Sequence, residues 1–267
     1  MHAQEAEMRI AVAGGTGLTG AIVVEQLRAA HDEIVVLSRA AGVDLLSGKG
    51  LAAALTGVQV VIDVSNVVTI KRHESEEFFR LATRNLLDAE AHAGVAHHVA
   101  LSIVGVDRVD LAYYFGKRIQ EELSLNGPVP ATVLRATQFH EFASQMLDRP
   151  SSLPAKAVLV PQMLCQPIAV HEVADALVRA AHESPAGLLP DLAGPHPLAL
   201  VDMVRGLVRV RGLKKRVLSV RVPGAGGKAA ASGGLLPTSE GPRGVQTYDQ
   251  WLATQRRASA RESGMIG

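Results

Sequence analysis

Short continuous apolar runs and stretches with helical spacing of apolar residues follow one another along the first half of the chain. Met8 to Ala13 is a short apolar run that ends in glycines, a pattern typical of a strand buried on both faces of a parallel sheet. From Leu18 to His31 the apolar residues recur at helical spacing, and Glu33 to Arg39 supplies a second apolar run. This order predicts a β-α-β unit at the beginning of the chain.

The alternation of strands and helices continues beyond this unit. Further strands are predicted at Val58 to Val64, His98 to Ile103 and Ala131 to Arg135, separated by helices near Ser75 to Ala93 and Asp110 to Leu125. Parallel strands need long crossovers, which are usually helices and are right-handed. The pattern therefore predicts an α/β fold built on a doubly wound parallel Rossmann sheet.

The pattern becomes looser after Pro150, and the second half of the chain predicts a smaller, mixed lobe. We expect residues 1–155 to form the Rossmann domain and residues 156–267 the C-terminal lobe, with a segment of about residues 171–196 returning to the Rossmann sheet. The stretch from Pro223 to Gly244 is rich in glycine and proline, so it predicts a mobile loop.

The composition is that of an ordinary globular protein. Hydrophobic residues make up 48% of the chain, charged residues make up 20%, and the formal net charge is +1, so we predict neither a nucleic-acid partner nor a membrane span. Cys165 is the only cysteine, which excludes an internal disulfide and indicates a reducing compartment. Met1 to Glu7 is polar and acidic, unlike a signal peptide. We therefore expect a cytoplasmic protein.

Two further patterns do not indicate a functional site. Seven basic residues between Arg205 and Arg221 interleave with apolar residues, as a solvated helix face or a helix packed in a homodimer would, and they lack stacking aromatics. His140-Glu141 and His171-Glu172 resemble the start of a zinc motif, but no second histidine follows four positions later. No metal site is predicted.

The turn after the first strand carries the strongest chemical signal in the sequence. Gly14 permits a tight turn, Gly17 allows the backbone to approach a pyrophosphate, and Gly20 allows the helix to pack closely on the strand. The spacing lies between a strand and a helix, so it predicts a dinucleotide on the helix N-terminus. The residues expected to contact the cofactor in this turn are Gly14, Thr16, Gly17, Leu18, Thr19 and Gly20.

The end of the second predicted strand indicates which dinucleotide binds. NAD-specific sites usually carry an acidic residue there, but this chain has Ser38 and Arg39. A hydroxyl and a guanidinium suit a 2′-phosphate, so NADP(H) is the expected cofactor. Asp44 lies a few residues further on, where it could accept a hydrogen bond from the adenine amino group or could serve as a capping or turn residue.

The motifs GGTGLTG, SRAAGVDL, ALSIVGVD, YYFGK and LRATQFHEF occur in this order, and the chain resembles the NmrA-like group of atypical short-chain dehydrogenase/reductases over about residues 8–200. The resemblance implies an active site of Ser102, Tyr113 and Lys117. It also implies that the nicotinamide lies near Val64, Ser65 and Asn66, which follow a central strand.

The residue types support this active site independently, because Tyr113 and Lys117 at positions i and i+4 share one face of a helix. A nearby ammonium is expected to lower the pKa of the phenol, and lysine can also reach a ribose hydroxyl. Ser102 ends a strand, where its hydroxyl could bind a carbonyl oxygen. The residues expected to contact the substrate follow the strand that ends at Arg135 and are Gln138, Phe139 and His140.

These residues predict an NADP(H)-dependent oxidoreductase that transfers a hydride between nicotinamide and a small, fairly apolar carbonyl or alcohol. Two alternatives stay open at this point. Some relatives in the NmrA-like group bind NADP(H) only as regulators, so the chain could be a catalytically silent redox sensor. An isomerase or dehydratase that retains its nicotinamide would carry the same turn.

Overall fold

The computed structural model describes residues 8–149 and 157–264, with side chains described up to residue 256. Residues 1–7, for which we expect no signal peptide, lie outside the described part. The described residues form two compact units. Unit 1 contains the described residues up to Val106, Leu111–Arg135 and His171–Pro190. Unit 2 contains Asp107–Asp110, the described residues of Ala136–Val170, and those from Asp191 onward. The division into domains at residue 155 stays a prediction.

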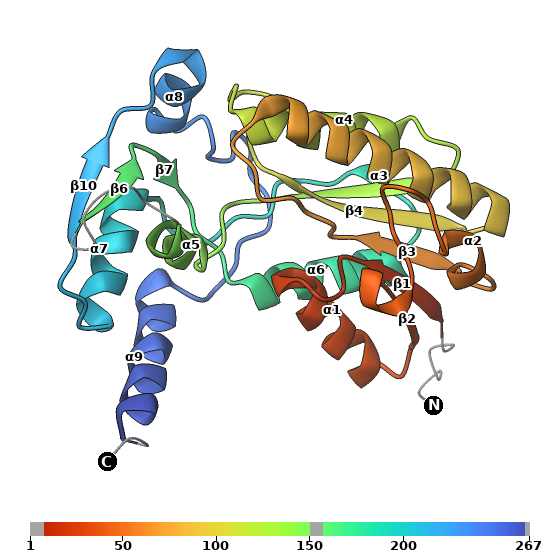
Figure 1. The fold of residues 1–267 in the computed structure, drawn as a ribbon, viewed down its shortest axis with the longest axis horizontal. Coiled ribbons are helices and arrows are strands. Elements are labelled where there is room, and N and C mark those ends of the chain that lie inside the picture. Colours follow the sequence, from red (N-terminus) through yellow and green to blue (C-terminus); the bar gives the residue numbers. More distant parts are fainter. Residues whose placement is uncertain (1–7, 150–156, 265–267) are drawn as a thin grey trace. The chain divides into compact units, whose positions relative to one another are not determined.

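Unit 1 is built on a six-stranded parallel sheet, which confirms the predicted fold class. The strands follow the order β2-β1-β3-β4-β5-β8. They are β1 Arg9–Ala13, β2 Glu33–Leu37, β3 Val60–Asp63, β4 His97–Ile103, β5 Ala131–Ala136 and β8 Gly187–Leu188. The side chains of β1 and β3 are almost all buried, because helices cover both faces of the sheet (Figure 1).

The direction of winding reverses between β1 and β3. The chain passes from β1 to β2 on one side and then crosses to β3 on the other side of β1. Ala13 at the end of β1 is paired with Leu37 of β2 and with Asp63 of β3, so the carboxyl ends of the three strands lie level. In open α/β sheets this reversal is where ligands bind.

The helices of unit 1 form a layer on each face of the sheet. In Figure 1, α3 and α4 cover one face, and α1 and α6 cover the other. The helices of this unit are α1 Leu18–Ala29, α2 Leu51–Ala54, α3 Arg72–Ala93, α4 Ala112–Leu125 and α6 Val170–His182, with a 3-10 turn at Arg39–Ala41. A buried cluster of aliphatic side chains lies between the sheet and this shell of helices.

Helices α3 and α4 approach each other closely at Gly116. A Cβ atom at this position would lie 2.3 Å from the Ser75 Oγ atom and 2.6 Å from the Phe79 Cδ2 atom, so only glycine fits. Ser75 also donates a hydrogen bond of 2.8 Å from Oγ to the carbonyl oxygen of Tyr113. This contact fixes the first two turns of α4 against α3.

Unit 2 contains two small sheets and four helices among its described residues. The strands β6 and β10 pair in parallel, and β7 and β9 pair in antiparallel. The strands are β6 Ala157–Pro161, β7 Leu164–Cys165, β9 Leu198–Ala199 and β10 Arg216–Val220, and the helices are α5 Phe142–Asp148, α7 Leu200–Val210, α8 Gly224–Ala231 and α9 Tyr248–Gly264.

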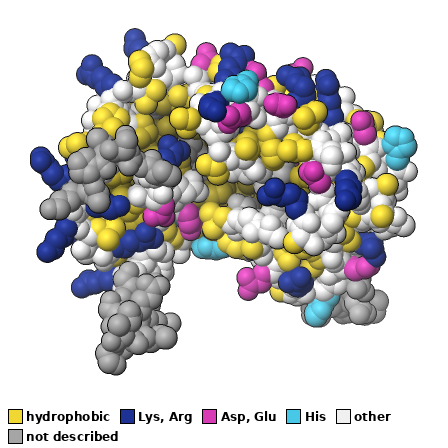
Figure 2. All heavy atoms as spheres, in the orientation of Figure 1, with side chains coloured by type: hydrophobic (Ala, Val, Ile, Leu, Met, Phe, Trp, Pro, Cys, Tyr) yellow, Lys and Arg dark blue, Asp and Glu magenta, His cyan; other side chains and the backbone are white. Residues whose placement is uncertain are grey.

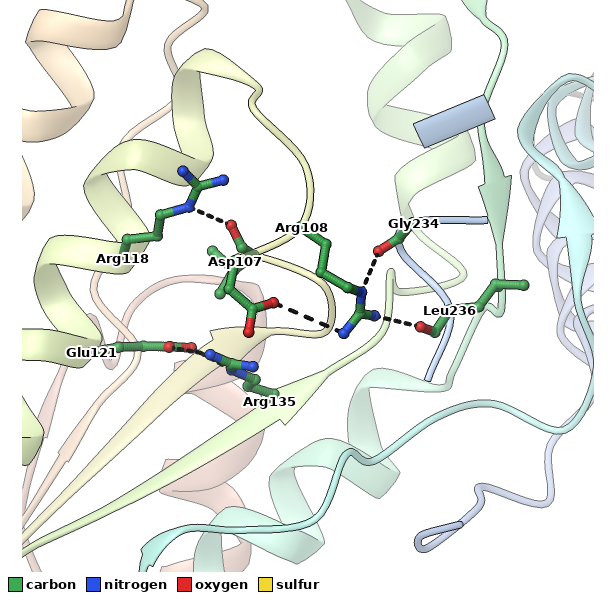
Figure 3. A network of polar contacts seen from close by, with 8 residues as sticks. Asp107, Arg108, Arg118, Glu121, Arg135, Gly234 and Leu236 are labelled. Carbon is green, nitrogen blue, oxygen red and sulfur yellow. Dashed lines mark hydrogen bonds and ion pairs between the residues drawn. The ribbon is translucent and has the colours of Figure 1, made fainter. Parts of the chain in front are cut away.

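The prediction of a loop from Pro223 to Gly244 is wrong, because this segment contains α8. Its glycines allow close packing: a Cβ atom at Gly226 would lie 2.1 Å from the carbonyl oxygen of Asp110. The chain after α8 is also fixed. Arg108 donates hydrogen bonds to the carbonyl oxygens of Gly234 and Leu236, at 3.3 Å and 2.6 Å (Figure 3).

The basic cluster between Arg205 and Arg221 follows α7 and β10. The buried residues of α7 include Met203, Val204 and Leu207, while Arg205 and Arg209 are exposed, as predicted for an amphipathic helix. In Figure 2, Lys and Arg side chains lie apart from one another along the edge of unit 2. Among the described residues, no helix is long and apolar enough to span a membrane.

Candidate functional site

The glycine turn joins β1 to α1 and lies against the end of β3. Gly14 has a φ of +78°, and a Cβ atom there would lie 2.8 Å from the Val64 carbonyl oxygen and 2.9 Å from the Ser65 Cα atom. At Gly20 a Cβ atom would lie 2.2 Å from the Gly14 carbonyl oxygen. The turn therefore accepts only glycine at these two positions, as its spacing predicts.

The N-terminus of α1 presents free backbone N–H groups rather than a capping side chain. Gly17 is the N-cap residue, no side chain caps the helix, and the first turn contains no acidic residue. Thr16 and Leu18 are exposed beside it, whereas Thr19 is buried. Unsatisfied N–H groups and the positive end of the helix dipole make this turn suited to a phosphate group.

Ser38 and Arg39 follow β2 directly, next to this turn in the order of the sheet. Ser38 Oγ accepts a hydrogen bond of 3.3 Å from Ala41 N, which closes the 3-10 turn. Arg39 is exposed, and the structure gives its side chain no hydrogen bond or ion pair within the described residues. Its guanidinium is therefore available to an anionic ligand.

Asp44 forms a local turn. Its carboxylate accepts hydrogen bonds from Leu46 N at 3.0 Å and from Ser47 Oγ at 2.9 Å. These two bonds, the backbone bond first, lower the pKa of Asp44. The turn role is thus visible in the structure, and contact with adenine stays a prediction.

The segment after β3 carries the residues expected at the nicotinamide. Asp63, the last residue of β3, is 1% exposed, and its Oδ1 atom accepts a hydrogen bond of 2.9 Å from Ser65 N. The Ser65 Oγ atom is buried and has no hydrogen-bond partner among the described residues. Val64 and Asn66 flank it, and the Val64 carbonyl oxygen contacts the glycine turn. This segment therefore offers a buried hydroxyl next to the turn.

Ser102 and Tyr113 lie on β4 and on the first turn of α4. Ser102 is buried, and within the described part of the chain its hydroxyl also lacks a hydrogen-bond partner. The Tyr113 hydroxyl donates a hydrogen bond of 2.6 Å to Asn66 Oδ1. Residues that we predicted from two separate motifs are thus in direct contact at the carboxyl edge of the sheet.

The pKa of Tyr113 departs from our expectation. Burial raises it well above the ordinary value for a phenol, and the nearby Tyr114 and the Asp63 carboxylate raise it further. The predicted lowering by Lys117 is therefore wrong for the protein without a ligand. The shared helix face is present, but the Lys117 ammonium bonds to other groups.

Lys117 is held in the core of unit 1. Its Nζ atom donates hydrogen bonds to the carbonyl oxygen of Leu101, which precedes Ser102, and to Gln120 Oε1. The ammonium also lies 4.9 Å from the centre of the Phe79 ring. Burial lowers the pKa of Lys117 to about 8, and the carboxylates of Asp63 and Glu121 oppose this change.

The buried face of α4 continues beyond Lys117 with further polar residues. Gln120 donates a hydrogen bond of 2.7 Å to Asp63 Oδ2. Glu121 accepts two hydrogen bonds from the Arg135 guanidinium, at 2.8 Å and 2.7 Å (Figure 3). All of these side chains have partners, as buried polar groups require.

Gln138, Phe139 and His140 lie in unit 2. Both polar atoms of the Gln138 amide are buried without a hydrogen-bond partner among the residues described. His140 is fully buried, its Nε2 atom lies 3.2 Å from the Gln246 carbonyl oxygen, and its ring packs beside Tyr248. Contact of these three residues with a substrate stays a prediction.

Asp63 and Gln120 are the two residues of this site that we did not predict. Asp63 is a charged residue in an otherwise apolar strand, and Gln120 follows Lys117 by three positions on the same helix face. Both signals are present in the sequence. Neither reveals that the two side chains contact each other, because they are 57 positions apart.

Comparisons with solved structures place this fold among known proteins. No protein-family model and no curated protein matches the sequence. MoeE5, in complex with UDP-glucuronic acid and NAD, superposes with a TM-score of 0.71 and 18% identity over 96% of this chain and 99% of that chain. A short-chain dehydrogenase/reductase superfamily protein from Agrobacterium tumefaciens, with bound NAD, has a TM-score of 0.67 and 18% identity over 96% of this chain and 98% of that one.

The triphenylmethane reductase from Citrobacter sp., complexed with NADP(H), has a TM-score of 0.68 and 17% identity over 93% of this chain and all 100% of its own. At these identities the comparisons establish the fold. This is the fold that the resemblance to the short-chain dehydrogenase/reductases implies.

The glycine turn generates a stability prediction with a matched control. Gly14→Ala and Gly42→Ala both place a side chain at a φ near +78°, which costs about 1–2 kcal/mol. A Cβ atom at Gly42 meets nothing within 4 Å, whereas at Gly14 it meets the backbone of Val64 and Ser65. Chemical denaturation should show that Gly14→Ala lowers the free energy of unfolding by about 1–3 kcal/mol more than Gly42→Ala. Equal losses would contradict the close approach.

The buried ammonium generates a pH prediction. The pKa of Lys117 is about 8 in the folded chain, against an ordinary value of 10.5, so the unfolded chain binds the extra proton between these two pH values. Folding stability should therefore rise with pH over this window by about 3 kcal/mol relative to Lys117→Met. Denaturation midpoints measured from pH 7 to 10.5 check this.

The control for this experiment is Lys49→Met, which removes an exposed lysine from the same unit. Its pH profile should follow that of the parent protein. If Lys117→Met also follows the parent, the lowered pKa is refuted.

Proposed function

We propose that the chain is an NADP(H)-dependent oxidoreductase that transfers a hydride between nicotinamide and a small, fairly apolar carbonyl or alcohol. One observation carries this proposal. The buried hydroxyls of Ser65 and Ser102 have no partner within the described residues. Ser65 lies two residues after β3 and against Gly14, and Ser102 is the second-last residue of β4, the neighbour of β3 in the sheet. Buried hydroxyls without a partner are costly, so they favour a ligand that satisfies them.

The residues of unit 1 fit a dinucleotide. Gly14, Gly17 and Gly20 leave room for a pyrophosphate at the N-terminus of α1, where the backbone N–H groups are free of side-chain caps. The segment from Val64 to Asn66 would face the nicotinamide, and Asp44 would lie near the adenine. When bound, NADP(H) would supply or accept the hydride.

The preference for a 2′-phosphate rests on Arg39. The similar structures contain NAD in two cases and NADP(H) in the third, so they support a nicotinamide dinucleotide without selecting between the two. Ser38 and Arg39 stand where an acidic residue would bind the ribose of NAD. A guanidinium that makes no hydrogen bond or ion pair with the described residues suits a phosphate and offers no acceptor to a ribose hydroxyl.

Tyr113 would be the proton donor for carbonyl reduction. A phenol whose pKa is raised keeps its proton at neutral pH, and it can pass this proton to an alkoxide, which is a much stronger base. Tyr113 must release Asn66 Oδ1 in order to donate to a substrate oxygen. Ser102 Oγ would donate a hydrogen bond to the same oxygen, and Lys117 would hold the ribose of the cofactor.

The chain after Asn66 favours an apolar substrate. Thr69 is anchored, since its hydroxyl donates a hydrogen bond of 2.6 Å to Glu74 and accepts one of 3.1 Å from Lys71 N. Val68 and Ile70 on either side of it are 94% and 81% exposed. Two exposed β-branched side chains, two and four positions after Asn66, suit an apolar molecule better than a charged one. Gln138, Phe139 and His140 are the substrate residues proposed for unit 2.

A second candidate is a catalytically silent NADP(H) sensor. The observation that favours it is the hydrogen bond from Tyr113 to Asn66, which occupies the phenol and leaves it without direct contact with Lys117. Such a protein would bind the same cofactor and consume no carbonyl compound.

The cofactor preference is tested on Arg39→Ala. Calorimetric titration should show that the parent binds NADPH more tightly than NADH, and that the variant loses at least about tenfold in NADPH affinity, the ratio expected for one charge-assisted hydrogen bond. Its NADH affinity should stay within about twofold of the parent's. Arg84→Ala, which removes an exposed arginine from α3, serves as the control. Equal affinities of the parent for the two cofactors would refute the argument.

The proton donor is tested on Tyr113→Phe, with the neighbouring Tyr114→Phe as the control. In an assay of NADPH oxidation with small apolar aldehydes and ketones, Tyr113→Phe should lower kcat by about 10²–10⁴-fold, the usual contribution of a general acid. NADPH affinity should be unchanged, because the ring is retained. Turnover that survives in Tyr113→Phe would refute Tyr113 as the proton donor. No turnover by the parent with any carbonyl would favour the sensor.

A further inference from the structure

We propose that Gln120 is a positioning residue for the cofactor site: its amide joins the Lys117 ammonium to the Asp63 carboxylate and so fixes α4 and the end of β3 in one geometry. The inference rests on the proposed function in one respect, namely that Lys117 and the segment after β3 bind the cofactor. The bridge itself is a property of the chain without a ligand.

The amide of Gln120 has only one orientation that both neighbours accept. Its Oε1 atom accepts a hydrogen bond from Lys117, which has only donors, and its Nε2 atom donates one of 2.7 Å to Asp63, which as a carboxylate has only acceptors. A reversed amide would place N–H groups against the ammonium and an oxygen against the carboxylate. The amide therefore has one orientation, with its oxygen towards Lys117 and its nitrogen towards Asp63.

Water cannot easily replace this bridge. Gln120 and Asp63 are each 1% exposed, and Lys117 is 4% exposed. A side chain at position 120 that cannot hydrogen-bond would leave two charged groups in the core with fewer partners, which is much more costly than the same loss at the surface. The glutamine is therefore needed to keep both charges in place.

The bridge connects the two parts of the site that we assign to the cofactor. Asp63 uses its other oxygen, Oδ1, to accept from Ser65 N, and Ser65 lies against Gly14 in the glycine turn. The hydrogen bonds thus run from Lys117 through Gln120 and Asp63 to the backbone beside the turn. Loss of Gln120 should therefore change the position of the Lys117 side chain and the position of the segment after β3 together.

The test compares Gln120→Leu with Gln120→Glu. Leucine removes the acceptor for Lys117, so the pKa of Lys117 should fall; glutamate adds a carboxylate beside the ammonium, so this pKa should rise. The titration of the lysine ¹³Cε signals by NMR, with Lys117→Met used for assignment, measures both changes without a cofactor. If Gln120→Leu does not fold, Gln120→Met takes its place, because methionine also lacks a strong acceptor for Lys117 and removes less volume. An unchanged Lys117 titration in it would overturn the bridge.

The second readout is NADPH affinity, measured by fluorescence titration. Gln120→Leu should weaken NADPH binding by at least about tenfold, because a charge-assisted hydrogen bond that holds Lys117 is lost. The control is Gln166→Leu, which removes a buried amide that donates 2.7 Å to Gly194 O in unit 2. It should leave both the Lys117 titration and NADPH affinity unchanged.

The two readouts separate the possible failures. A shifted Lys117 titration with unchanged NADPH affinity would retain the bridge and overturn its positioning role. A parent protein that binds neither NADPH nor NADH would overturn the proposed function and the positioning role, while the NMR titration would still decide on the bridge. Opposite shifts in the two variants together with weaker NADPH binding in Gln120→Leu would support the whole inference.

Discussion

The arrangement of the site depends on one buried carboxylate, that of Asp63 at the end of β3. An ionised carboxylate in a protein interior is tolerated only when hydrogen bonds replace its water. Asp63 obtains them from the backbone of Ser65 and from the amide of Gln120, so it ties a strand end to a helix. The glycine turn then packs against the same strand end. Satisfying one charge thus sets the positions of β3, α4 and the turn relative to one another.

The order of the strands explains why polar groups meet at the carboxyl edge of the sheet. The crossover from β2 to β3 brings the end of β1 beside the end of β3, and β4 follows next in the sheet. Helix α4 then supplies Tyr113 and Lys117 from one face, because they are four positions apart. Gly116 lets this helix pack tightly on α3. A hydride-transfer site needs a cofactor cradle, a proton donor and a hydrogen-bond donor that orients the substrate oxygen in one place. Unit 1 offers candidates for all three.

The sequence was sufficient for the fold class and for the position of the glycine turn between β1 and α1. Buried parallel strands are continuous apolar runs, so β1 and β4 were predicted to within one residue at each end. The glycine turn follows from local spacing. The Gln120–Asp63 contact could not be predicted, because it joins positions that become neighbours only in the folded sheet. The pKa of Tyr113 was misjudged for a related reason: helix spacing places Lys117 on the same face, but burial and the Leu101 carbonyl decide where the amine points. Helix α8 was missed because glycines that serve close packing look the same in sequence as glycines that serve flexibility.

The exposure of Arg39 has a consequence for how this protein can change. Its side chain makes no hydrogen bond or ion pair with the described residues, so the fold does not depend on it. The glycine turn, in contrast, has no room for any other residue at Gly14 or Gly20. The proposed preference for NADP(H) therefore rests on a surface residue that can be replaced without loss of the fold, whereas the glycines of the turn cannot be replaced.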